Sequence, residues 1–321
     1  MKDLFGHTPI PKHYNIRRPI LAKMLHQVFC QSKMTGKRLV RMLYSEFEAV
    51  FDFLLLCKGA RRGEKISLLF NPHRLEIPGI EKRSWVEAFN NHPTQADGLA
   101  RACLSRLSTG QGKETRQLLY GIMAMNVNKA FYPFEFPPFI ARRHFQSFQA
   151  RSILDPCAGW GGRMIGAASV GAYYEAWEPS TKTYKGLVKL GEWLKGFETG
   201  FDFLVHHQPF EDGTVAREFD LAYASPPYFN TERYSDEPTD SANRYPTFDL
   251  WVERFYLPMI YKALERSKGG LVINIGCRRY DLRTPLNCFR VRQLPSLMTS
   301  KGGLGRRRTG GEAFFHIQSN T

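Results

Sequence analysis

The chain has 321 residues, of which 43% are hydrophobic and 13% aromatic, and a formal net charge of +15. This composition predicts a globular protein with one large domain or two ordinary ones. It excludes a membrane span, because no stretch of about 18 uncharged apolar residues occurs. Six scattered cysteines without close pairs predict neither a disulfide framework nor a zinc site. Together with an N-terminus that lacks the apolar core of a secretory signal, they favour a reducing cytoplasm.

The positive charge is concentrated in the first half of the chain. Residues 1–150 hold 23 lysines and arginines against 11 acidic residues, whereas residues 151–321 hold 22 against 19. A basic half joined to a nearly neutral half predicts a polyanionic partner, most simply a nucleic acid. A generally basic surface is the alternative, and charge alone does not distinguish DNA from RNA.

Residues 1–130 are expected to form a basic, mainly helical module that binds nucleic acid. Apolar residues recur at helical spacing after an extended arm over 1–18, and one helix is predicted over 37–57 with Gly59 as its end. The arginine doublets at 61–62 and 142–143 suit phosphate oxygens, although ordinary solvated charges explain them equally well. An aromatic, proline-rich stretch near residue 130 marks the boundary to a second domain over 131–321.

The second domain alternates between strand and helix patterns. The predicted strands are 153–155, 173–177, 203–205, 221–224 and 271–275, and helices are predicted over 140–148, from 163, over 183–194 and over 248–267. Such alternation predicts an α/β fold with a doubly wound, mainly parallel sheet. A last strand-like segment, 313–317, is expected to pair as an edge strand.

A glycine-rich turn follows the first of these strands. The strand ends at Asp155, and the turn then runs through Pro156, Cys157, Ala158, Gly159, Trp160, Gly161 and Gly162. Glycines let the backbone approach a ligand closely, and the N-terminus of the next helix faces that ligand, as in nucleotide-cofactor sites. A turn that only connects two elements is the alternative.

Two further motifs lie at the ends of later strands. Glu178, ahead of Pro179, ends the second strand at the distance where a carboxylate meets a cofactor ribose; a helix-capping acid is the alternative. The fourth strand ends in Ser225, Pro226, Pro227 and Tyr228. Two prolines fix the backbone, and an aromatic face beside them can stack on a planar ring.

The glycine turn and Ser225–Tyr228, in this order and spacing, resemble S-adenosylmethionine-dependent amino-methyltransferases of DNA. The wider stretch, with Tyr234–Glu237 and Asn243–Pro246, is similar to phage-encoded proteins classed as DNA methyltransferases, and the resemblance covers about residues 134–320. It implies the Rossmann-like methyltransferase sheet, S-adenosylmethionine as cofactor, and transfer of a methyl group to the exocyclic amine of adenine or cytosine. It also implies a duplex DNA partner whose target base is flipped out, and a bacterial or phage-infected cytoplasm.

The resemblance assigns roles to individual residues. Ser225, Pro226, Pro227 and Tyr228 would grip the target base, and Glu178 with Pro179 would hold the ribose. The rest of the cofactor would contact Phe136, Pro137, Asp155, Pro156, Ala158, Gly159, Trp160, Gly161, Phe210 and Glu211.

Some features depart from the family or remain open. Ser225 stands where Asp or Asn is commonest, so the target base stays open between adenine and cytosine. The dipeptide Pro156-Cys157 resembles the nucleophile of carbon-directed cytosine methylation, but it lies inside the cofactor turn, and that mechanism is rejected. His206-His207 lack partners at ligand spacing, so no metal is expected. An RNA base methyltransferase and a catalytically idle nucleic-acid-binding protein are the alternatives.

Overall fold

The structure is a computed structural model, and its described part falls into two compact units. It describes residues 44–78, 135–231, 234–276, 279–295 and 313–319, with residues 35, 37, 40, 83–84, 86–87, 130–131 and 133. One unit comprises Met1–Glu46 with Pro72–Pro133, and the other comprises Phe47–Asn71 with Phe134–Thr321. In the first unit, η1 (Pro72–Glu76) is a 3-10 helix, and β1 (Arg83–Ser84) pairs in parallel with β2 (Ala130–Phe131).

The second unit is built on a seven-stranded sheet with the order β5-β4-β3-β6-β7-β9-β8. Five strands are parallel, and β9 is antiparallel to both β7 and β8. The strands are β3 (Ser152–Asp155), β4 (Tyr173–Trp177), β5 (Asp202–His206), β6 (Leu221–Ala224), β7 (Leu271–Ile275), β8 (Arg290–Gln293) and β9 (Ala313–Gln318). The chain winds outward in both directions from β3 and β6, so a ligand crevice is expected at their carboxyl ends.

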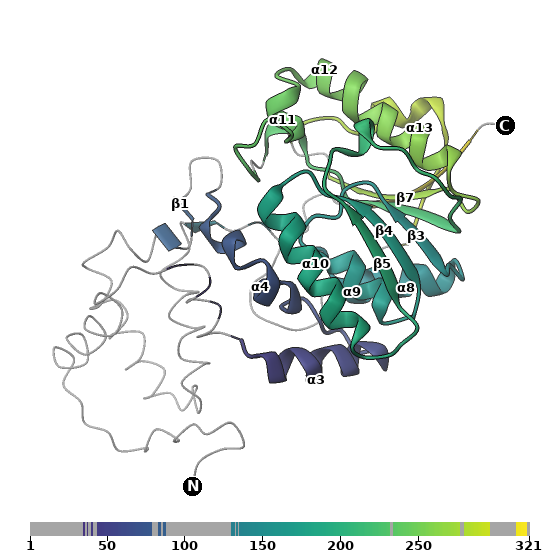
Figure 1. Ribbon diagram of the computed structural model, residues 1–321. Coiled ribbons are helices and arrows are strands. Elements are labelled where there is room, and N and C mark those ends of the chain that lie inside the picture. The colour runs from purple at the N-terminus through teal and green to yellow at the C-terminus, as the bar shows by residue number, and fades with distance from the viewer. Residues whose placement is uncertain are drawn as a thin grey trace, which may run out of the picture. The chain divides into compact units, whose positions relative to one another are not determined.

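Helices cover both faces of this sheet (Figure 1). One face carries α8 (Pro138–Ser147), α9 (Gly162–Ala168) and α10 (Thr181–Lys195). The other carries η2 (Phe210–Asp212), α11 (Ser241–Arg244), α12 (Phe248–Trp251), the π-helical turn η4 (Val252–Tyr256) and α13 (Leu257–Glu265). Short 3-10 turns, η3 (Phe229–Thr231) and η5 (Thr284–Cys288), lie in the connections. The doubly wound Rossmann-like class predicted from the alternating pattern is confirmed.

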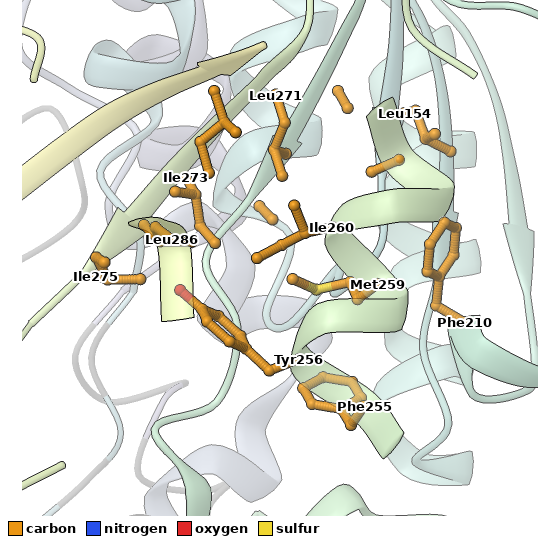
Figure 2. Packing of buried hydrophobic residues seen from close by; sticks show 14 of the residues in the cluster. Leu154, Phe210, Phe255, Tyr256, Met259, Ile260, Leu271, Ile273, Ile275 and Leu286 are labelled. Carbon is orange, nitrogen blue, oxygen red and sulfur yellow. The ribbon is translucent and has the colours of Figure 1, made fainter. Parts of the chain in front are cut away.

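The main hydrophobic core lies between the sheet and α13 (Figure 2). Met259 and Ile260 of α13 are fully buried against Leu271 and Ile273 of β7. Every residue of β7 is buried, which is the pattern of a strand covered on both faces. The core therefore fixes β6 and β7, and with them the position of the loops that follow these strands.

Residues 47–71, expected in the N-terminal module, pack instead within the second unit. Helix α3 (Glu46–Cys57) places Phe53 4.5 Å from the ring of Phe197, and α4 (Ile66–Phe70) places Phe70 5.6 Å from Trp193. Both helices thus add a layer outside α10. The composition of this segment is equally compatible with a separate helical module, so the sequence alone did not reveal its partner.

Two expected elements differ in detail, and one strand was not expected. The single helix predicted over 37–57 is interrupted at Tyr44 and Ser45, although Gly59 ends it with the left-handed φ of 92°. The segment 313–317 is not an edge strand, because β8 pairs on its outer side. Strand β8 was not predicted, because its four residues are all exposed and so show no buried alternation. The nucleic-acid-binding role of residues 1–130 stays a prediction, since most of them lie outside the described residues.

Candidate functional site

A cavity lies where β3, β4 and β6 end, and it joins the motifs predicted separately. The glycine turn, the acid after β4 and the proline corner after β6 all contribute to its wall. Its lining residues are Glu135, Phe136, Pro156, Cys157, Gly159, Trp160, Arg163, Glu178, Pro179, Ser180, Thr183, Pro209, Phe210, Glu211, Ser225, Pro227, Tyr234, Thr239, Asp240, Ser241 and Phe255. The glycine turn and the proline corner therefore meet at one site, as a shared cleft requires.

Asp155 does not line this cavity. Its side chain instead anchors the glycine turn. Its carboxylate lies 2.6 Å from Nε of Arg163, accepts a hydrogen bond from the Tyr174 hydroxyl at 2.5 Å, and accepts the backbone N–H of Cys157 at 3.0 Å. Asp155 is completely buried. Arg163, which Asp155 holds, does line the cavity, and the predicted contact between Asp155 and a cofactor stays a prediction.

Within the glycine turn, only part of the backbone faces the cavity. Pro156, Cys157, Gly159 and Trp160 line it, and Gly159 has the positive φ of 57°. Ala158 is buried and donates its N–H to the carbonyl of Trp177, so it does not line the cavity.

Gly161 has a packing role rather than a lining one. Its φ is 98°, and a Cβ there would lie 2.5 Å from Cδ2 of Leu190 on α10. Gly161 thus permits the close approach of α10 to the turn. Gly161 does not line the cavity, and its predicted contact with the cofactor stays a prediction.

Glu178 lies at the bottom of the cavity and is buried. Its Oε1 accepts the N–H of Ser180 at 2.9 Å. Burial raises the pKa of Glu178 to about 8, against the lowering effect of the Ser180 and Gly159 N–H groups. Pro179 lines the cavity beside it. A buried carboxyl with a raised pKa suits a ligand that brings hydroxyl donors or positive charge.

The segment ahead of α8 also reaches the cavity. Phe136 lines it and stacks under the guanidinium of Arg163, 5.3 Å from the ring centre, whereas Pro137 only caps α8. Glu135 accepts the N–H of Gly162 at 2.9 Å and also bonds the hydroxyl of Ser67. Glu135 thus binds the first turn of α9.

The wall opposite the glycine turn comes from η2 and from the segment that follows β6. Phe210 and Glu211, to which the resemblance assigns cofactor contacts, both line the cavity. Burial raises the pKa of the Glu211 carboxyl from its ordinary value, although Arg244 opposes the rise.

The proline corner is divided between the cavity and the core. Ser225 and Pro227 line the cavity, whereas Pro226 is buried and Tyr228 packs partly against the hydrophobic core. Tyr234 lines the cavity instead, 5.9 Å from the ring of Trp160 in an edge-on arrangement.

Several lining residues were not identified from the sequence. They are Glu135, Arg163, Ser180, Thr183, Pro209, Thr239, Asp240, Ser241 and Phe255. For Arg163 a signal existed, because a single arginine lies among apolar and small residues in the otherwise buried α9. The others come from loops and from α10, α11 and η4, and which of their residues reach the cavity depends on tertiary contacts.

Cys157 and the neighbouring pair His206-His207 each contact identified residues. Burial and the charge of Asp155 raise the pKa of the Cys157 thiol well above its ordinary value, which disfavours a nucleophilic thiolate. His206 pairs with Glu175 at 2.9 Å, and His207 contacts the hydroxyl of Thr181 at 3.1 Å. Within the described residues there is no group of three potential metal ligands, and no helix is long and apolar enough to cross a membrane.

Solved structures similar to this chain include several methyltransferases. One from Pyrococcus furiosus is 13% identical, with 63% of this chain and 96% of the other covered and a TM-score of 0.40. A magnesium protoporphyrin IX methyltransferase from Synechocystis with bound S-adenosylmethionine is 12% identical (67% and 89% covered, TM-score 0.37). An rRNA methylase from Streptococcus thermophilus is 14% identical (58% and 97% covered, TM-score 0.35). No protein-family model matches the sequence, and the search of curated proteins found no similar one. At these identities none of the neighbours identifies a substrate for this chain.

Proposed function

We propose that the protein is an S-adenosylmethionine-dependent methyltransferase that methylates the exocyclic amine of adenine or cytosine in DNA. The observation that carries this proposal is the shared cavity of the glycine turn (Gly159, Trp160), Glu178 and the proline corner (Ser225, Pro227). A cofactor on one side of this cavity and a base amine on the other would lie in contact. Holding two reactants in this way is the main source of catalysis in a direct group transfer.

The side chains that line the cavity fit S-adenosylmethionine. The Glu178 carboxylate can accept both ribose hydroxyls, and the rings of Pro209 and Phe210 offer apolar surface to adenine. Three further carboxylates, Glu135, Glu211 and Asp240, border the cavity and favour a cationic ligand. When bound, this cofactor supplies a methyl group on a positively charged sulfur. Arg163, which Asp155 holds in place, would face the carboxylate of its methionine part.

The protein's own contribution is positioning and exclusion of water. Ser225 and Pro227 line the cavity, and the rigid Pro226-Pro227 corner would hold the Ser225 side chain and the neighbouring carbonyls where they can accept the hydrogens of an amine. Tyr228 lies at this corner and Tyr234 inside the cavity, so either ring can support a flipped base, which costs roughly a few kcal/mol to extrude. No side-chain nucleophile is required, in agreement with the raised pKa of the Cys157 thiol.

Nucleic acid is the substrate class that the charge favours. The net charge is +15, and most of the excess lies in residues 1–150. A basic chain with a base-sized site beside a cofactor site supports a polyanionic substrate. DNA rather than RNA follows from the resemblance of the glycine turn and Ser225–Tyr228 to DNA amino-methyltransferases.

Nucleoside mass spectrometry tests the proposal. The protein is incubated with methyl-labelled S-adenosylmethionine and either duplex DNA or RNA, and the polymers are digested to nucleosides. We expect labelled N6-methyldeoxyadenosine or N4-methyldeoxycytidine. Label only in ribonucleosides would favour the RNA enzyme, and label in neither polymer would contradict a nucleic-acid methyltransferase. Arg217→Ala, at an exposed arginine over the Tyr173 ring and away from the cavity, serves as the control variant.

A further inference from the structure

The carboxylate of Glu211 is held by Arg244 and Tyr245, two side chains of the stretch Asn243–Pro246 to which the sequence assigned no individual role. Arg244 Nη1 lies 3.0 Å from Oε1 of Glu211, and the Tyr245 hydroxyl donates to the same oxygen at 3.1 Å. The Glu211 side chain is only 8% exposed. Because both donors reach Oε1, the second oxygen, Oε2, keeps lone pairs for a further donor.

The Arg244 side chain is also held by Asp212. Its two terminal nitrogens form a fork on Asp212, with Nη1 2.8 Å from Oδ2 and Nη2 3.0 Å from Oδ1. This bidentate geometry sets the plane of the guanidinium, and Nη1 then has one remaining direction, toward Glu211. Arg244 bonds the adjacent carboxylates of Glu211 and Asp212 at the same time, and its charge offsets their mutual repulsion.

Lys262 of α13 holds the backbone of the same turn. Its Nζ donates to the carbonyls of Phe210, Glu211 and Gly213 at 2.8, 2.9 and 2.9 Å. An ammonium group has three donors, and all three are used here. The turn η2 is therefore fixed in its backbone by Lys262 and in its acidic side chain by Arg244 and Tyr245.

We infer that Arg244, Tyr245 and Lys262 are positioning residues that present Glu211 to the exocyclic amine of the cofactor's adenine. This inference rests on the proposed function, since it concerns the cofactor of that site. A carboxylate accepts hydrogen bonds and donates none, so it suits the amino group of adenine and repels a carbonyl oxygen at the same ring position. Glu211 thereby makes the site selective for an adenosyl group.

The ratio of affinities for two ligands tests this role directly. S-adenosylhomocysteine carries the amine, and S-inosylhomocysteine has an oxygen in its place. Calorimetry on the full chain should give a preference for the adenosyl ligand of about ten-fold or more, since a site built for a hydrogen-bond donor rejects an analogue without it. Arg244→Ala should reduce the preference to about two-fold, and Arg244→Lys, which keeps the charge but loses the fork, should fall between.

A second variant and a control separate positioning from folding. Tyr245→Phe removes one hydroxyl and should lower the same ratio by a smaller factor, even if Arg244→Ala fails to fold. Arg217→Ala should keep the ratio of the unaltered protein. The double variant Glu211→Gln with Arg244→Ala should be no less selective than Glu211→Gln alone, because both changes remove one interaction.

The outcomes distinguish this inference from the proposed function. Tight binding of S-adenosylhomocysteine with a ratio that neither Arg244→Ala nor Tyr245→Phe changes would overturn the positioning role and leave the methyltransferase proposal intact. Binding of neither ligand by the unaltered protein would overturn both.

Discussion

Nε of Arg163 lies 2.6 Å from Oδ2 of Asp155, and the two side chains are 4% and 0% exposed. This ion pair joins the end of β3 to the first turn of α9 across the glycine turn. It therefore sets the shape of the turn that borders the cavity, while Asp155 itself stays out of contact with it.

Asp155→Ala should lower the free energy of unfolding by about 3–5 kcal/mol, because it leaves the charge of Arg163 buried without a partner. Urea denaturation measures this change. The same variant should lose S-adenosylmethionine binding in calorimetry, since the turn also loses the anchor for the N–H of Cys157. The double variant Asp155→Leu with Arg163→Met should recover much of the stability and not the binding. Normal cofactor affinity in Asp155→Ala would contradict the account of this turn.

The affinity for S-adenosylmethionine should rise with pH around a midpoint near 8. Burial raises the pKa of Glu178 to about 8, and the ionised carboxylate accepts both ribose hydroxyls, so binding is accompanied by proton release. Calorimetry between pH 6 and pH 9 measures the trend, and Glu178→Gln should bind weakly with little dependence on pH. A flat profile in the unaltered protein would argue against Glu178 as the ribose ligand.

The same carboxyl should make the ligand-free protein less stable as pH rises. The pKa of Glu178 in the folded state, about 8, exceeds its ordinary value of 4.5, so the native state binds the proton more tightly than the unfolded state. The contribution of this group is complete below about pH 4.5 and is lost as pH rises toward 8. Thermal melts of Glu178→Gln, compared with the unaltered protein across this window, isolate the effect, and identical slopes in the two proteins would refute it.

Cys157→Ala should retain methyl transfer within a few-fold of the unaltered rate. Burial keeps the Cys157 thiol protonated, and its sulfur lies 3.6 Å from that of Met259, in a packing position. Initial rates with labelled cofactor give the comparison. Complete loss of activity with a normal melting temperature would revive a covalent mechanism at cytosine carbon.

Tyr228→Ala should spare cofactor binding and stop methyl transfer, because the ring belongs to the corner that we propose grips the base. Tyr228 also packs against the core, so Tyr228→Phe is the matched control for folding and should keep most of the activity. Calorimetry and transfer assays on both variants provide the two readouts. Equal loss of cofactor binding and transfer in Tyr228→Ala would point to a purely structural role.

DNA affinity should fall steeply with salt, because neutralised phosphates release counterions. With a net charge of +15 concentrated in residues 1–150, we expect the logarithm of the binding constant to fall linearly with the logarithm of the salt concentration. Fluorescence anisotropy on a labelled duplex from 50 to 200 mM salt measures the slope. A flat response would remove the basic half from the binding mechanism.

The fold of the second unit was predictable because its strands are encoded locally. The apolar runs ending at Asp155 and Ala224, and the turn residues after them, indicate both the strands and the edge at which their loops meet. The antiparallel strand pair at the other end of the sheet was only half predicted, since β8 has no apolar face.

Residues of the site were predictable from the sequence where one residue type carries the chemistry. They were less predictable where tertiary contacts decide whether a residue lines the cavity. Glu178, Glu211 and Ser225 line the cavity as expected. Asp155 and Gly161 do not line it, because Asp155 pairs with Arg163 and Gly161 packs closely against Leu190 of α10. Neither partner is specified by the motif, and each becomes visible only once the helices are packed.

Asn71 donates from Nδ2 to the carbonyl of Trp160 at 3.2 Å, and Ser67 bonds Glu135. A fragment that begins at the apparent boundary near residue 130 would lack Ser67 and Asn71, and would lose these contacts with Glu135 and with the glycine turn. Shortened versions of this protein should therefore keep residues 47–71 joined to the remainder, or supply them as a separate peptide, if the turn is to hold its shape.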